Sequence, residues 1–93
     1  MIRTFKCVET QKIWEGRVSK KLPSQIQQVT RRKLRMLDSA HVLNDLRIPP
    51  ANRLESLQGS RAHQYSIRIN DQWRLCFCWR AGDVFDVEMI DYH

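Results

Sequence analysis

The second part of this 93-residue chain contains no lysine: residues 36–93 include six arginines and eight acidic residues. Residues 1–35 contain ten lysines and arginines but only two glutamates, so their formal charge is +8, against −2 for the remainder. Positive charge gathered in one third of a chain attracts polyanions. Charge alone leaves two interpretations open, which are nucleic-acid binding and a solvated basic helix face.

Long apolar runs are also missing. No run approaches the roughly 18–20 residues of a membrane span, and the opening residues MIRTFKCVE lack the apolar core of a signal peptide. We therefore expect a cytoplasmic protein with no membrane partner. The sequence contains no repeat, linker or glycine-rich phosphate loop, and its length predicts one domain, residues 1–93.

Cysteine is scarce, and its odd count of three argues against a disulfide framework. Cys76 and Cys78 are two residues apart, so they would point to the same face of a strand. A zinc site would need further ligands, and Cys7, His41 and His63 are the remaining candidates. We favour small buried thiols in a reducing compartment and expect no metal or cofactor.

The first half of the chain predicts a strand and two helices. MIRTF is rich in β-favouring residues, and ETQKIWEG predicts a short helix that ends at Gly16. PSQIQQVTRRKLRMLDSA predicts a longer helix, with a capping box formed by Ser24 and Gln27. At helical spacing its apolar side carries Ile26, Val29, Met36, Leu37, Ala40 and Leu43, with Leu34 at the edge.

From residue 64 the hydrophobic period changes to two. QYSIRIN, WRLCFCWR and VFDVEMID alternate in polarity and are separated by the turn sequences NDQ and AGD. They predict a three-stranded antiparallel meander, with Phe85, Val87 and Met89 on one face of its last strand. Together with the first strand and the helices, this meander predicts an α+β fold of two layers.

The helices are expected to cover one face of the sheet and to leave Arg68, Asn70 and Arg74 on the other. A meander also places the start of its second strand, at Arg74, beside the end of its third strand, at residues 91–93. Arginine can hold a phosphate, and histidine can move protons near neutral pH. Such a cluster could cleave RNA without a metal, since the 2′-hydroxyl is an internal nucleophile.

Structural roles for the same residues are the alternative. Arg74 could form a cross-strand ion pair with Glu88 or Asp86, which would stabilise the fold little. Tyr92 could be a core residue with its hydroxyl in water. The residue pattern alone does not decide between catalysis and these roles.

The segments NRLESLQGSRAHQYSIRINDQWRLCFCW and VEMIDYH together resemble the HigB-type toxins of the RelE/ParE superfamily. The resemblance runs from MIRTF to DYH. It implies a RelE-like fold and ribosome-dependent cleavage of translated mRNA by 2′-hydroxyl attack, without a metal. It also implies a HigA-like helix-turn-helix antitoxin as partner, with operator DNA bound only by the toxin–antitoxin complex.

The resemblance further assigns catalytic roles to residues. Arg74 matches the family arginine that is taken to hold the scissile phosphate. Asp91, Tyr92 and His93 match the terminal family motif, in which His93 would be the acid or base and Tyr92 would position the substrate. Asp91 would then orient the imidazole.

Other positions depart from the family pattern. Glu55 and Gln58 stand where several members have a histidine and a lysine, and Asn70 stands where some have an arginine. Glu55 is therefore a candidate second acid–base group, with a role as a plain surface residue as the alternative. The basic residues between 17 and 35 would meet ribosomal RNA or an acidic antitoxin. The expected RNA contacts are Gln58, Arg61, Arg68 and Asn70.

Two other functions are compatible with the sequence. A ParE-like toxin would inhibit DNA gyrase without cutting RNA and would not need His93. A non-catalytic RNA-binding module would bind isolated RNA with a steep salt dependence.

Overall fold

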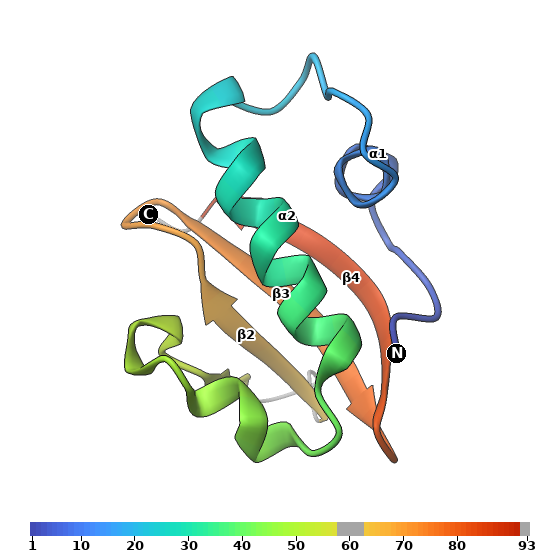
Figure 1. Ribbon diagram of the computed structural model, residues 1–93, viewed down its shortest axis with the longest axis vertical. Helices are drawn as coiled ribbons and strands as arrows, with labels where there is room; N and C mark the ends of the chain where they lie inside the picture. Colours follow the sequence, from blue (N-terminus) through green and yellow to red (C-terminus); the bar gives the residue numbers. More distant parts are fainter. Residues whose placement is uncertain (58–62, 92–93) are drawn as a thin grey trace.

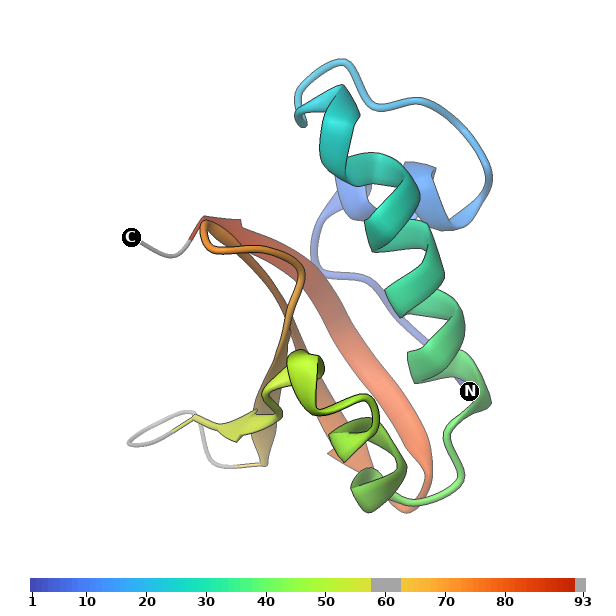
Figure 2. The same cartoon turned by 60° about the vertical axis from the view of Figure 1, so that its left-hand side comes forward.

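The computed structural model describes residues 1–57 and 63–91 (Figure 1). Its elements, in chain order, are the helices α1 (Val8–Trp14) and α2 (Ser24–Ser39), the 3-10 turns η1 (Leu43–Arg47) and η2 (Pro50–Asn52), and the strands β1 (Glu55–Ser56), β2 (Gln64–Arg68), β3 (Trp73–Arg80) and β4 (Asp83–Asp91). The strands form one antiparallel sheet in the order β1-β2-β3-β4. Both α-helices lie on the same side of this sheet (Figure 2). The predicted two-layer α+β fold, including the meander, is confirmed.

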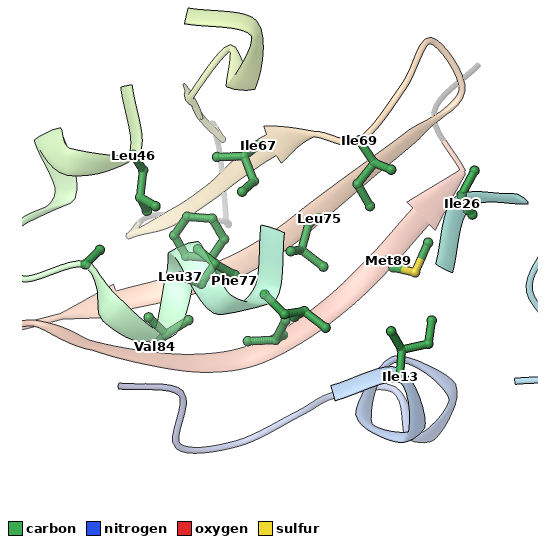
Figure 3. Packing of buried hydrophobic residues seen from close by; sticks show 13 residues of the cluster. Ile13, Ile26, Leu37, Leu46, Ile67, Ile69, Leu75, Phe77, Val84 and Met89 are labelled. Atoms are coloured by element: carbon green, nitrogen blue, oxygen red, sulfur yellow. The ribbon is translucent and has the colours of Figure 1, made fainter. Parts of the chain in front are cut away.

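The core lies between α2 and the sheet (Figure 3). Leu34 and Leu37 of α2 and Leu75 of β3 are fully buried, and Phe77 is 1% exposed. Leu34 therefore belongs to the centre of the helix face and not to its edge. Each of these side chains contributes roughly 1.5–3 kcal/mol through its removal from water. No helix in the described part of the chain is long and apolar enough to cross a membrane.

The capping box predicted at the start of α2 is wrong. Pro23 occupies the N-cap position, and no side chain caps the helix. The side chain of Gln27 instead binds the preceding loop: its amide nitrogen donates to the carbonyls of Ser19 at 2.8 Å and Leu22 at 3.0 Å, and its oxygen accepts from the Ser19 N–H at 3.1 Å. Because Gln27 is buried, these loop contacts satisfy its polar atoms.

Residues 1–6 run parallel to the outer edge of β4, as a strand would, but they form only two isolated bridges (Figure 1). Ile2 is bridged to Val84, and Phe5 is bridged to Val87. Between these two points β4 is irregular, and this interrupts the ladder. The predicted N-terminal strand is therefore present only as these two points of pairing.

The irregularity in β4 is a β-bulge. Cys78 pairs with Phe85, whereas Cys76 pairs with Glu88, so β4 has one residue more than β3 in this interval. The alternation predicted for β4 is consequently wrong at Phe85, which is only partly buried. Val84, which is fully buried, takes the core position.

Asp86 carries the backbone strain of the bulge, with a φ of 55°. Its N–H donates to Oγ1 of Thr4 at 2.9 Å. A residue from the start of the chain thus stabilises the bulge in β4. The sequence around Asp86 contains no glycine to signal such a bulge.

Candidate functional site

Arg74, at the start of β3, has a side chain that is only 8% exposed. Its Nε donates to Oγ of Ser66 at 2.8 Å. Its Nη2 donates to the carbonyl of Arg53 at 2.6 Å and to that of Ser66 at 3.2 Å. Hydrogen bonds from a charged donor are the stronger kind, so the guanidinium is held in one orientation.

The sheet register explains how these groups meet. Arg74 of β3 lies opposite Arg68 of β2. Ser66 precedes Arg68 by two residues in β2, so its side chain is on the same face of the sheet as that of Arg74. The side chain of Arg74 reaches diagonally across β2 to Ser66. Arg53 follows η2 in the left-handed region, with a φ of 46°, and its carbonyl accepts from the end of the guanidinium.

Among the proposed catalytic residues that the structure describes, Glu55 is the one that it brings to Arg74. β1 pairs with β2 so that Glu55 lies opposite Ser66. The Glu55 Oε2 atom is 3.9 Å from Nη2 of Arg74, and the glutamate side chain is 54% exposed. An ion pair this long and this exposed stabilises the fold little. The carboxylate is thus accessible to solvent while lying beside a fixed positive charge.

The end of β4 lies beside the start of β3, as the meander predicted. Arg74 pairs with Ile90, and Trp73 pairs with Asp91. Because successive residues of a strand point to opposite faces, Asp91 shares the face of Trp73 and not that of Arg74. Oδ2 of Asp91 accepts a hydrogen bond from Gln72 Nε2 at 3.1 Å.

Arg68 and Asn70, two of the predicted RNA contacts, bind the turn between β2 and β3. Arg68 forms an ion pair with Asp71. Oδ1 of Asn70 accepts from the backbone N–H groups of Gln72 at 2.9 Å and Trp73 at 2.8 Å. Both side chains therefore fix the turn that precedes Arg74. The other proposed site residues, Gln58, Arg61, Tyr92 and His93, lie outside the described residues.

The described residues contain no group of three or more His, Cys, Asp or Glu side chains that could hold a metal ion. Cys76 and Cys78 are buried, as expected for small core thiols. Burial raises the pKa of the Cys78 thiol, and the nearby Asp86 carboxylate raises it further. This keeps Cys78 in its protonated and less reactive form.

Two groups of the site were missed from the sequence. Ser66 could have been found, because the period of two places this polar residue on the face of Arg74. The backbone carbonyl of Arg53 could not, because nothing in its side chain indicates where its carbonyl points.

Residues 4–93 match the family model of the RelE-like toxin of the type II toxin–antitoxin system HigB. The chain belongs to this family. Toxin HigB-1 of Vibrio cholerae is 49% identical over 61 residues, which are 66% of this chain and 64% of that protein. The match thus spans slightly less than two thirds of the Vibrio toxin. Endoribonuclease HigB of Proteus vulgaris is 28% identical over 93 residues, with both chains covered completely.

Solved structures of YafQ and of a YoeB–YefM complex share the fold of this HigB-family chain. YafQ from E. coli strain BL21(DE3) has a TM-score of 0.69 at 11% identity, with 98% of this chain and 91% of YafQ covered. The YoeB–YefM complex from Staphylococcus aureus gives a TM-score of 0.58 at 15% identity, covering 100% of this chain and 98% of that one. At these identities the likeness concerns the fold alone, and it agrees with the predicted RelE-like architecture.

Proposed function

We propose that this HigB-family chain is a ribosome-dependent endoribonuclease that cleaves translated mRNA. The observation that carries the proposal is the buried guanidinium of Arg74, which is fixed by Ser66 and Arg53 beside the carboxylate of Glu55 and the end of β4. A fixed cation next to an accessible carboxylate suits phosphodiester chemistry. The Proteus relative, which is named an endoribonuclease, supports the same reaction class.

The proposed reaction is an internal phosphoryl transfer. The 2′-oxygen of the ribose attacks the adjacent phosphorus, and the bond from phosphorus to the 5′-oxygen breaks. A base takes the 2′-proton, and an acid gives a proton to the leaving 5′-oxygen. The products are a 2′,3′-cyclic phosphate and a 5′-hydroxyl. The nucleophile belongs to the substrate, so the step needs no metal-activated water.

Each proposed role follows from the chemistry of the side chain. Arg74 stabilises the negative charge that develops on the phosphate, because its guanidinium is already oriented. Glu55 takes the 2′-proton, and His93 protonates the leaving oxygen. Tyr92 positions a nucleobase by stacking. Asp91 lies on the opposite face from Arg74, and it would act through the residues that follow it in the chain.

The proposed partners are the ribosome with its mRNA and a HigA-like antitoxin; operator DNA would be bound only through the antitoxin. A cleft of about 420 Å³ lies between α1 and the loop before α2, and it is lined by Glu9, Lys12, Arg17, Val18, Lys20 and Lys21. Four of these six side chains are cationic, so the cleft suits a phosphate backbone or an acidic peptide. The YoeB–YefM complex gives a precedent for pairing on this fold. A toxin that acts on translated mRNA would work in the cytoplasm.

The test is the mapping of mRNA 5′ ends by primer extension in reconstituted translation, with and without ribosomes. We expect cuts within translated codons, and we expect Arg74→Ala to slow them about 100-fold. Deletion of His93 should also slow them strongly. Arg80→Ala is the matched control, since Arg80 is an exposed arginine at the other end of β3.

The same assay separates the other functions. Cuts that are missing from translated codons, or that persist undiminished in Arg74→Ala, would refute the proposal. Inhibition of gyrase supercoiling without RNA cleavage would identify a ParE-like toxin. Salt-sensitive binding to isolated RNA without cleavage would identify a binding module.

A further inference from the structure

Lys33 of α2 is a lysine in an unusual place. It lies on the buried side of the helix, with 6% of its surface exposed. Its Nζ donates to Oδ1 of Asn52, which is itself fully buried. The amide nitrogen of Asn52 donates in turn to the carbonyls of Leu46 at 3.1 Å and Ile48 at 3.4 Å. One asparagine side chain therefore joins α2 to the two 3-10 turns.

The residue after Asn52 is Arg53, whose carbonyl holds the guanidinium of Arg74 at 2.6 Å. The turn around it is closed by two backbone bonds, from Asn52 N–H to the Pro49 carbonyl at 2.9 Å and from Arg53 N–H to the Pro50 carbonyl at 3.0 Å. The amide of Asn52 and the carbonyl that orients Arg74 thus belong to consecutive residues.

Stability does not explain this lysine. A buried ammonium is costly when it lacks a carboxylate partner, and within residues 1–57 and 63–91 no ion pair of Lys33 is found. Burial lowers the pKa of Lys33, and the charges of Arg32 and Arg68 lower it further. An apolar side chain would fill the same space at less cost.

Lys33 fixes the orientation of the Asn52 amide. An ammonium only donates hydrogen bonds, so it can face only the oxygen of the Asn52 amide and never its nitrogen. The nitrogen must then face the carbonyls of Leu46 and Ile48. Without this donor the buried amide oxygen would lose its hydrogen bond, and the side chain of Asn52 would be held through its nitrogen alone.

We propose that Lys33 and Asn52 are positioning residues for Arg74. Lys33 fixes the amide of Asn52, the amide fixes the turn, and the turn presents the Arg53 carbonyl that orients the guanidinium. The effect on cleavage rests on the function proposed above. The effect on the orientation of Arg74 does not.

The first experiment compares Lys33→Met with Lys6→Met in the full chain. Both variants lose one lysine charge, but Lys6 is exposed and paired with Glu88. We expect Lys33→Met to lower kcat about tenfold with KM nearly unchanged, because a displaced catalytic group slows the chemical step. Lys6→Met should keep the wild-type kcat. In a chain that already carries Arg74→Lys, Lys33→Met should lower kcat by less than about twofold. Both changes affect the same guanidinium, so their effects are not additive.

The second experiment does not need activity. In a chain labelled with ¹⁵N arginine, the Nε–H of Arg74 should exchange slowly with water, since it is buried and bonded to Ser66. Lys33→Met should speed this exchange about tenfold and shift the resonance, whereas Lys6→Met should do neither. If the wild-type chain does not cleave RNA, this measurement still tests the positioning.

If Lys33→Met does not fold, Asn52→Asp takes its place. This variant keeps an oxygen for Lys33 but loses the donor for the carbonyls of Leu46 and Ile48, so it should loosen the same turn and speed the same exchange. Equal exchange rates in the wild type and the folded variant would overturn the proposal. So would a fall in kcat that Lys6→Met reproduces, or an undiminished effect of Lys33→Met in the Arg74→Lys background.

Discussion

Removal of the Ser66 hydroxyl is the sharpest test of how Arg74 is held. Ser66 is fully buried, and its Oγ accepts from Nε of Arg74 at 2.8 Å. Ser66→Ala leaves the backbone and the carbonyl of residue 66 in place. It therefore removes one hydrogen bond from the guanidinium and keeps its two bonds to backbone carbonyls.

The magnitude follows from the burial of the charge. A hydrogen bond to a charged group contributes about 1.5–3 kcal/mol, and a buried donor left without a partner loses its solvation as well. Some of this loss is recovered if Arg74 turns toward water. We expect the free energy of unfolding to fall by about 1–2 kcal/mol and, because the guanidinium is then less fixed, mRNA cleavage to slow about tenfold.

Urea denaturation measures the free energy of unfolding, and single-turnover cleavage on ribosomes measures the rate of mRNA cleavage. The matched control is Ser56→Ala, since Ser56 is an exposed serine of β1. It should change neither quantity measurably. Unchanged stability and cleavage in Ser66→Ala would show that the hydroxyl does not hold Arg74.

Three further predictions concern the rest of the molecule. The stability of the wild type relative to Lys33→Met should rise as the pH approaches 10.5. The pKa of Lys33 is lowered in the folded state, so the unfolded state binds more protons in that pH range. If this is wrong, the difference between the urea midpoints of the two proteins will not change with pH. Phe77→Ala should cost about 3–5 kcal/mol of stability, since the ring is 1% exposed, and a loss below about 1 kcal/mol in thermal unfolding would contradict the packing. Cys7, which is only partly buried, should react with a thiol reagent before Cys78, whose pKa is raised by burial, and equal rates would disprove this order.

The sheet could be predicted from sequence because its information is local. The alternation from Gln64 to Asp91 and its two turn sequences define the meander, and the meander alone places Arg74 beside the end of β4. The proximity of Arg74 to the end of β4 could therefore be predicted without knowing any side-chain contact. Helix α1 could also be predicted from the sequence, because a glycine marks its end. Gly16 follows the C-cap residue Glu15 and adopts a φ of 83°.

The features that sequence reasoning missed depend on distant residues. The bulge at Asp86 is stabilised by Thr4, which is 82 residues away in the chain. β1 has two exposed residues and therefore no alternation that could reveal it. Lys33 was grouped with a basic surface because lysine is rarely buried, yet Asn52 gives it a partner in the interior.

The contacts made by the first ten residues have a consequence for synthesis. The Met1 amino group binds the carbonyl of Gly82, and Thr10 Oγ1 binds the N–H of Met89, so these partners are 81 and 79 residues apart. A chain made from its N-terminus therefore leaves its first ten residues without these hydrogen-bond partners until β4 has been translated. Since β4 also supplies the edge beside Arg74, the nascent chain cannot assemble its proposed active site early. Because these contacts join residues far apart in the chain, the first ten residues should become ordered late in folding, together with β4.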